Sequence, residues 1–259
     1  MLYKSYNPSD DLKNFVEEYI FIQNRADDWV PENDKFIPRL GESIVFHLEK
    51  SCCLLENNEK IVLPKAFAIG QHLHFTNVIP AKKYDLIIIR LKPASIYTLF
   101  QLSPLYFKES HVDLFTLEES IPALYQSLSE NSDENDRVQI INSFLSDKMH
   151  ETGHDEKHEL VIKVIDKIIE NKGCIEIAKF YSLFSVNERT LRRYFKVQIG
   201  LSVKEFSLLV KFSNIVQELI RDPSAEMMDI VARYNYFDQN HFIHDFKNIL
   251  GETPSYFFK

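Results

Sequence analysis

The sequence predicts an α+β protein, with short strands framed by helices in its N-terminal part and helices alone in its C-terminal part. Runs of β-branched and aromatic residues between turn-forming residues predict the strands. Apolar residues at helical spacing predict the helices, and a segment of the C-terminal part that occurs twice predicts a repeated helical unit. We expect an N-terminal domain of strands and helices at residues 1–149, a linker at 150–158 and a helical domain at 159–259.

The N-terminal part begins with a predicted helix, which Ser9 can cap and whose apolar residues are Leu12, Phe15, Val16 and Tyr19. The strand-like runs that follow are Ser43–Leu48, Ile61–Leu63, Ala66–Ile69, Phe75–Ile79 and Tyr84–Leu91. They favour an antiparallel barrel or sandwich. Further helices are expected near Ala94–Leu102, Glu118–Leu128 and Asp136–Met149, and the apolar stripe of the last one could pack on the barrel or on a second subunit.

The segment HETGHDEKH, residues 150–158, is polar and separates two regions with periodic apolar residues. His150, His154 and His158 could align as metal ligands on a continuous helix. Gly153 and the surrounding charges favour a solvated linker instead.

The segments NERTLRRYFKVQIGLS and DQNHFIHDFKNILGET form the repeat. The matched pairs, 51 residues apart, are Asn187/Asp238, Leu191/Phe242, Phe195/Phe246, Lys196/Lys247, Gly200/Gly251 and Ser202/Thr253. Upstream of each copy lie four apolar residues at helical spacing. These two sets are 50 rather than 51 residues apart, so the turn of the second copy has one added residue. Each copy predicts a helix, a tight turn, an N-cap (Asn187 or Asp238) and a second helix. Two copies favour paired helix–turn–helix units, which place their second helices in the DNA major groove, over a hairpin that contacts another protein.

The two second helices differ in the residues that face outward. In the first they are Arg189, Thr190, Arg192, Arg193 and Lys196, and in the second they are Gln239, Asn240, His241, His244 and Lys247. Arginine pairs with guanine and clamps phosphates, whereas Gln and Asn suit adenine. We predict that all ten residues bind DNA, the first set with a guanine contact and most of the affinity, the second with adenine-leaning specificity. Each arginine could instead contact only a phosphate or lie on a solvated face.

Two segments resemble a known family. Tyr236–Lys247 (YFDQNHFIHDFK), followed by GETPSYF, resembles the C-terminal signature of AraC-type transcription regulators. Glu188–Lys196, followed by Gly200-Leu-Ser202, resembles their first helix–turn–helix. The resemblance covers about residues 158–259. It implies two helix–turn–helix units joined by a long helix, about Val203–Ile220, that bind adjacent major-groove segments on one face of the duplex.

The sequence departs from this family pattern at several positions. Tyr181 and Val231 stand where a small alanine is usual, and Ser185 and Asn235 stand where the turn usually has glycine. Asn tolerates a left-handed backbone. The larger Tyr181 requires a local adjustment. His244 stands where an arginine or a similar long side chain is common.

The segments NPSDDLKNFVEEYIF, IPRLGESIVFHL, AIGQH and IIRLKP resemble the N-terminal sensor domain of a subset of these regulators, over about residues 5–115. This resemblance implies a cupin-like β-fold that binds an effector or mediates dimerisation. A metal there would need His47, His72 and His74, but no Glu accompanies them at the expected spacing, so structural roles are favoured. No residue identifies a ligand.

Charge is unevenly distributed along the chain, whose net charge is −8. Residues 1–157 hold 16 basic and 25 acidic residues, and residues 158–259 hold 14 and 13. The near-neutral C-terminal part predicts modest nonspecific attraction to phosphates. No apolar run approaches the ~20 residues of a membrane span, and we expect no signal peptide. Three cysteines, two of them adjacent, indicate free thiols and a cytoplasmic location. For a chain that binds DNA, we expect this location to be nucleoid-associated.

No phosphate loop, nucleophile elbow or zinc-spaced Cys/His set is present, so we expect neither an enzyme nor a cofactor. We expect a sequence-specific transcription regulator, an activator more than a repressor because the resembled family leans that way. Its expected partners are double-stranded DNA and, further, a small-molecule effector, a second copy of the chain and RNA polymerase. The alternatives are a DNA repair or modification enzyme with the same helical pair and a protein–protein adaptor.

Overall fold

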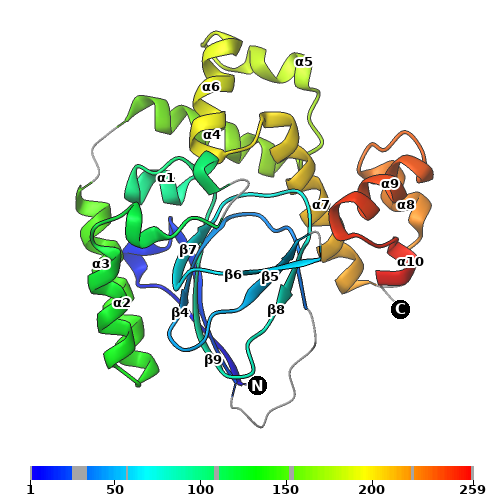
Figure 1. Cartoon of the computed structure of the whole chain (residues 1–259). Helices are drawn as coiled ribbons and strands as arrows, with labels where there is room; N and C mark the ends of the chain where they lie inside the picture. The colour runs from blue at the N-terminus through cyan, green and yellow to red at the C-terminus, as the bar shows by residue number, and fades with distance from the viewer. Residues whose placement is uncertain are drawn as a thin grey trace. The chain divides into compact units, whose positions relative to one another are not determined.

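The computed structural model describes residues 2–24, 34–56, 58–107, 111–151, 155–222 and 225–257. It divides into two compact units (Figure 1). The N-terminal unit comprises Met1–Phe36, Gly41–Gly70 and Thr76–Asp155, and the helical unit comprises Ile37–Leu40, Gln71–Phe75 and Glu156–Lys259. Strands lie in the first unit and helices dominate the second, which confirms the α+β class.

The N-terminal unit contains two antiparallel sheets. The larger has the order β1 (Leu2–Tyr6), β2 (Val16–Asn24), β9 (Tyr84–Leu91), β4 (Glu42–His47) and β7 (Ala66–Ile69). The smaller has the order β3 (Asp34–Phe36), β8 (Thr76–Ile79), β5 (Cys53–Glu56) and β6 (Glu59–Val62). The sheets pack on each other through a cluster that includes Val45, Leu54 and Phe67. Among the described strands no ladder joins the two sheets, so the expected barrel is not closed.

The helix predicted from Ser9 to Tyr19 is wrong. Asp10–Leu12 forms a single 3-10 turn, and β2 follows, paired with β1 on one side and β9 on the other. The apolar spacing is compatible with a helix, but the run of aromatic and β-branched residues at 19–22 fits a strand that neighbours cover on both edges. The observed β7 and β9 have the predicted bounds, whereas β1, β3 and β5 are strands that the pattern did not predict.

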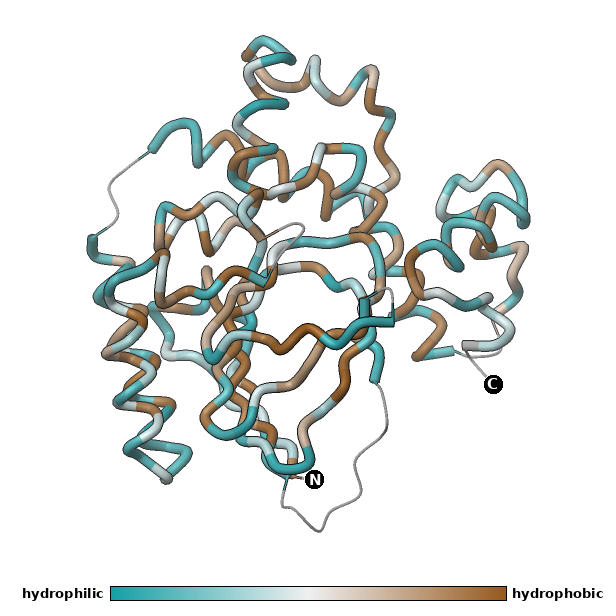
Figure 2. Tube along the Cα trace, in the orientation of Figure 1, coloured by the Kyte–Doolittle hydropathy of each residue, from teal (hydrophilic) through white to brown (hydrophobic). Residues whose placement is uncertain are grey.

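The three helices expected after the strands are present as α1 (Ser95–Phe100), α2 (Ile121–Glu130) and α3 (Glu134–Glu151). They lie together beside the larger sheet (Figure 1). Figure 2 shows hydrophobic and hydrophilic residues alternating along α2 and α3. Ile141 and Leu145 of α3 are buried in the same core as Ile44 and Ile89 of the sheet, so the stripe of this helix packs on its own domain.

The helices of the helical unit are α4 (Glu156–Glu170), α5 (Ile177–Phe180), the 3-10 turn η4 (Tyr181–Leu183), α6 (Glu188–Ile199), α7 (Val203–Arg221), α8 (Met227–Arg233), α9 (Gln239–Leu250) and α10 (Pro254–Phe257). The longest, α7, begins at a capping box of Ser202 and Glu205. Phe206, in its first half, packs edge-on against Phe195 of α6, with ring centroids 5.6 Å apart. Phe212, in its second half, packs in the same way against Phe246 of α9 at 5.3 Å. One helix therefore supplies core residues to both copies of the repeat.

Helices take up much of the segment that we interpreted as a linker. The helix α3 continues to Glu151 and α4 begins at Glu156. Residues 152–154, including His154 of the histidine row, lie outside the described residues. His158 belongs to α4, and its Nδ1 lies 2.9 Å from Oε1 of the buried Gln198 on α6.

Candidate nucleic-acid interface

The two candidate reading helices, α6 and α9, begin in the same way. The Oδ1 atom of Asn187 accepts a hydrogen bond from the Arg189 N–H at 2.8 Å, and the Oδ1 atom of Asp238 accepts one from the His241 N–H at 2.7 Å. Both residues have an extended backbone. Such caps satisfy backbone N–H groups that would otherwise lack a partner at the first turn of the helix.

The two helices also end in the same way. Gly200 and Gly251 have left-handed backbones with φ of +78° and +79°, and their N–H groups donate to the carbonyl oxygens of Lys196 and Lys247 at 2.9 and 2.8 Å. Glycine adopts this conformation without a steric penalty. The residues at matched apolar positions are fully buried; they are Leu191, Phe195, Phe242 and Phe246. The repeat thus encodes two alike helices with buried apolar faces.

The helices that precede α6 and α9 differ from each other. In the first copy, α5 has four residues and changes to a 3-10 turn at Tyr181, which is 7% exposed. This change is the local adjustment that a large residue at the crossing requires. In the second copy, α8 has seven residues, and Asn235 in the turn has a left-handed φ of +53°, as expected. Ser185 is not among the described residues with positive φ, so the two turns follow different backbone paths.

On α6, Arg189, Arg192 and Arg193 are exposed. The Arg192 guanidinium lies 5.0 Å from the centre of the Tyr181 ring, and its Nη2 atom lies 2.5 Å from Oε1 of Glu188. Arg193 lies over the neighbouring Tyr194 ring at 5.2 Å. The guanidinium of Arg192 is therefore held at the side of α6 by an aromatic face and a carboxylate.

Two other predicted residues of α6 are only partly exposed. Thr190 is half-buried, and so is Lys196, whose Nζ atom lies 3.6 Å from Oε2 of Glu205. Burial raises the pKa of the Tyr181 phenol, an effect that the adjacent Arg192 opposes. The tyrosine beneath Arg192 is thus a neutral ring at physiological pH.

On α9, the five predicted residues Gln239, Asn240, His241, His244 and Lys247 are all exposed. Asp245 is a residue that the sequence interpretation missed. Its carboxylate lies 3.7 Å from His241 Nε2 and 3.8 Å from His244 Nδ1. A carboxylate between two histidines on this face repels DNA phosphates, so α9 offers less electrostatic attraction than α6.

Phe237 is a second residue that the sequence interpretation missed. It directly precedes the cap of α9 and is 91% exposed. An apolar residue at this position often packs against the fourth residue of the helix, here Phe242. Phe242 is fully buried without it, whereas Val186, the matching residue of the first copy, is half-buried. The sequence could have indicated the exposure of Phe237, because this aromatic residue stands directly before a row of polar residues.

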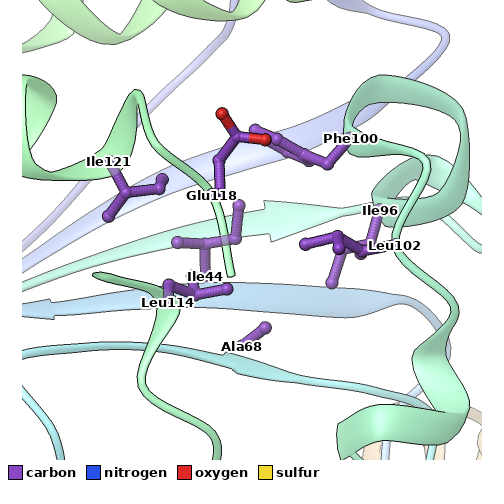
Figure 3. Close-up of a pocket in the computed structure, with 8 residues that line it drawn as sticks. All are labelled: Ile44, Ala68, Ile96, Phe100, Leu102, Leu114, Glu118 and Ile121. Atoms are coloured by element: carbon purple, nitrogen blue, oxygen red, sulfur yellow. The ribbon is translucent and has the colours of Figure 1, made fainter. Parts of the chain in front are cut away.

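The N-terminal unit contains a small apolar pocket (Figure 3). Its lining residues come from β4, β7, α1, the stretches that follow α1 and precede α2, and the start of α2; they are Ile44, Ala68, Ile96, Phe100, Leu102, Leu114, Glu118 and Ile121. The free volume is about 10 Å³, the room of about one water molecule. In Figure 3 the Glu118 carboxylate lies at the upper edge, beside the Phe100 ring.

Glu118 is the single charged residue of this lining. Its Oε1 atom accepts hydrogen bonds from Ser120 Oγ at 2.5 Å and from Lys148 Nζ at 3.1 Å. Burial alone would raise the pKa of this carboxyl, but the bonds from Ser120 and Lys148 outweigh it and hold the pKa below its usual value. The edge of the pocket therefore carries an ion pair at neutral pH.

Of the three histidines considered for a metal site, His47 has other partners. His47 is buried; its Nδ1 lies 2.9 Å from the Pro64 carbonyl oxygen, and its Nε2 accepts the Cys52 N–H at 3.3 Å. Burial lowers its pKa. His72 and His74 belong to a segment that groups with the helical unit. Among the described residues, no cluster of three or more His, Cys, Asp or Glu could hold a metal ion.

Two known protein families match most of the chain. A family described as a helix-turn-helix domain matches residues 182–259, which hold both α6 and α9. The C-terminal part of the chain is thus a helix-turn-helix domain of the AraC type. A second family, a domain of unknown function (DUF6597), matches residues 4–113. No curated protein matches the chain. None of the described helices is long and apolar enough to cross a membrane.

Solved structures of similar fold include ToxT. The structure of ToxT from Vibrio cholerae O395 bound to (E)-4-(8-methylnaphthalen-1-yl)but-3-enoic acid has a TM-score of 0.50 and 10% identity, covering 93% of this chain and 98% of that one. ToxT from strain SCE256 with a bound unsaturated fatty acid has a TM-score of 0.45 and 12% identity, covering 92% and 94%. The AraC-like transcriptional activator CuxR has a TM-score of 0.21 and 8% identity, covering 95% and 80%. The first of these supports the overall fold.

Proposed function

We propose that this AraC-type regulator binds double-stranded DNA by placing α6 and α9 in successive segments of the major groove. The observation that carries the proposal is the structural repeat. Two capped helices of equal length bury matched apolar faces and expose polar or basic ones. A helix of this kind, preceded by a short helix and a turn, fits the major groove with its N-terminal residues foremost.

The two helices make unequal contacts. On α6, Arg189 and Arg193 lie one turn apart on the exposed face, and we assign them the base contacts, with guanine as the preferred base. Arg192 and Lys196 lie on the side of the helix with carboxylate partners, and we assign them backbone contacts. The sequence left both base and phosphate contacts open for each arginine, and this proposal assigns one kind of contact to each.

The second helix contributes sequence preference more than affinity. Gln239 and Asn240, at the start of α9, suit adenine. Phe237, exposed just before them, suits the methyl group of thymine, because burying an aromatic face on a methyl group removes apolar surface from water. We therefore propose that the second half of the operator is rich in A·T pairs.

We further propose that a small apolar molecule bound in the N-terminal unit modulates DNA binding. The pocket beneath α1 has seven apolar lining residues and the ion pair of Glu118 and Lys148 at its edge. A solved structure of ToxT holds an aromatic butenoic acid. A ligand of similar chemistry would place its apolar body in this pocket, which must widen to admit it, and its carboxylate near Lys148.

Selection of bound sequences from random DNA tests the proposal. The expected result is two half-sites with centres about one helical turn, 10–10.5 base pairs, apart, one containing G·C and the other A·T. Salt-dependent protection of about two turns of the duplex would accompany it. Binding that depends on neither sequence nor salt would overturn the proposal. Repeating the selection with small-molecule extracts tests the effector.

Activation, dimerisation and contact with RNA polymerase are proposals that rest on the family resemblance. In vitro transcription from a promoter carrying the selected operator tests the first and the last. A rise in transcript with added protein supports activation, whereas a fall indicates a repressor. Sedimentation of the free chain and of the DNA complex tests whether two copies associate.

A further inference from the structure

We propose that the groove between α5, α6 and the start of α7 binds one phosphate of the DNA backbone, and that Tyr181 positions the arginine that holds it. This inference rests on the proposed DNA binding. The groove has a volume of about 360 Å³, and its lining residues are Ile177, Tyr181, Arg192, Lys196, Ser202, Val203 and Lys204. Since about 10–15 Å³ of such free volume holds one water molecule, the groove has room for a phosphate group and several waters.

Three cations line the groove, and two carboxylates oppose them. Glu188 pairs with Arg192 at 2.5 Å, and Glu205 pairs with Lys196 at 3.6 Å. Lys204 is exposed, and within the described part of the chain no carboxylate lies at ion-pair distance from its ammonium group. The groove therefore keeps a surplus of one positive charge. A surplus cation beside two paired ones attracts a singly charged phosphodiester.

The backbone N–H groups at the N-terminal end of α7 do not themselves bind the anion. The N–H of Ser202 donates to Oε2 of Glu205 at 2.7 Å, and the N–H of Glu205 donates to Oγ of Ser202 at 3.2 Å. This capping box satisfies the first turn of the helix. An anion in the groove is therefore held by the side chains of Arg192, Lys196 and Lys204.

Tyr181 holds the guanidinium of Arg192 at the wall of this groove. The tyrosine ring is buried, and the guanidinium carbon lies 5.0 Å from the ring centre. A cation over an aromatic face gains electrostatic attraction and loses rotational freedom. The large residue that departs from the small one usual at this crossing thus acquires a role, because it directs Arg192 to the side of α6.

The second copy of the repeat shows that the groove is not a general consequence of the fold. With the same offsets, Tyr181 corresponds to Val231, Arg192 to Ile243 and Lys204 to Ser255, while Lys196 corresponds to Lys247. The second copy thus retains one of the three cations and lacks the aromatic ring. The first copy has a phosphate clamp that the second does not have.

The position of the groove favours a backbone phosphate over a free one. Arg192 and Lys196 form one row along α6, and Arg189 and Arg193 form another. When Arg189 and Arg193 face base edges in the major groove, Arg192 and Lys196 face the backbone of the DNA strand that borders the groove. Phosphate contacts of this kind fix the register of a protein on the duplex without reading its sequence.

The test measures Kd for the selected operator against KCl concentration, for the wild type and Lys204→Ala. We expect the slope of log Kd against log salt to fall by about 0.9, so the Kd ratio of variant to wild type shrinks about 3.5-fold between 50 and 200 mM salt. The matched control Lys163→Ala removes an exposed lysine from α4 and keeps the wild-type slope. The loss of affinity in Lys204→Ala is equal across single-base variants of the operator.

Operators with single methylphosphonate groups locate the phosphate. At one position, neutralisation weakens binding of the wild type several-fold and weakens binding of Lys204→Ala by a smaller factor, because Arg192 and Lys196 still face that phosphate. Tyr181→Phe keeps the wild-type slope, whereas Tyr181→Leu lowers it; thermal melting verifies that both variants fold. Inorganic phosphate at constant ionic strength does not displace the operator. Displacement at millimolar phosphate would mean that the groove binds a free anion and would overturn the assignment to DNA.

Two failures are distinguishable. If the wild type binds the operator with normal salt dependence but Lys204→Ala has the same slope and no phosphate position is coupled to it, the groove is not a phosphate site and the proposed function stands. If the wild type binds no DNA in a salt-dependent way, the proposed function fails and this inference fails with it.

Discussion

The buried carboxyl group of Glu42 makes the stability of the N-terminal unit depend on pH. Glu42 begins β4 and is 2% exposed. Its oxygens accept the N–H of Ile96 at 2.7 Å and that of Ala94 at 3.3 Å, at the start of α1. Burial raises its pKa to about 8, although these two hydrogen bonds oppose the rise. The folded protein therefore holds a proton on Glu42 at neutral pH.

The sign and size of the effect follow from linkage. In the unfolded chain the pKa has its ordinary value of 4.5. Between pH 4.5 and 8 the folded state binds one more proton than the unfolded state, so its stability falls as pH rises, by about 1.4 kcal/mol per pH unit. The stabilisation is complete below pH 4.5 and is lost above pH 8. The full change amounts to about 5 kcal/mol.

Comparison of the wild type with Glu42→Gln measures this effect. Hydrogen exchange of β4 and β9 peptides in increasing urea gives the unfolding free energy of this unit at pH 5 to 9. The amide cannot ionise, so we expect the wild type to lose stability relative to the variant by about 1.4 kcal/mol per pH unit up to pH 8. The exposed Glu17→Gln controls for removal of a carboxylate. A wild-type-to-variant difference that is the same at every pH would refute the reasoning.

Three further predictions concern the helical unit. Gly173→Ala destabilises it by at least about 2 kcal/mol, because φ is +72° and the new Cβ would lie 2.2 Å from the Ser207 carbonyl oxygen; an unchanged melting temperature would contradict this. Phe237→Ser leaves stability within about 0.5 kcal/mol but removes a preference for thymine at one operator position, which a repeated selection measures. Arg189→Ala and Asn240→Ala each relax the preference at a different base pair, by about 1–3 kcal/mol in binding assays across single-base variants; uniform weakening by both would exclude base reading.

The sequence predicted the helical unit better than the sheets because its signals are local. A cap such as Asn187 and a terminal residue such as Gly200 act within one turn of their own helix. The strand β2 depends instead on β9, about seventy residues away. Its apolar spacing fits two structures, and only pairing with distant strands decides between them. Whether the two sheets close into a barrel is also decided by distant pairing.

The candidate interface was predictable to the extent that it follows from periodicity. Helical spacing alone placed residues such as Arg189 and Asn240 on exposed faces. The stacking of Arg192 on Tyr181 depends on contact between two helical segments. The exposure of Phe237 depends on whether residues from other parts of the unit cover it. Neither is encoded in the spacing of residues along one helix. The proposed division of the arginines between base and phosphate contacts therefore required the structure.

The helix α7 fixes both the distance and the rotation between the two helix pairs. Its 19 residues span about 28 Å at 1.5 Å per residue, and each half is anchored in the core of one helix pair. A regulator built on such a rod cannot adjust to operators of variable spacing, since one added base pair turns the second half-site by roughly 35° around the duplex. Deletion or insertion within α7 would likewise turn one helix pair by about 100° per residue. Divergence among regulators of this design is therefore easier on the reading faces than in the rod between them.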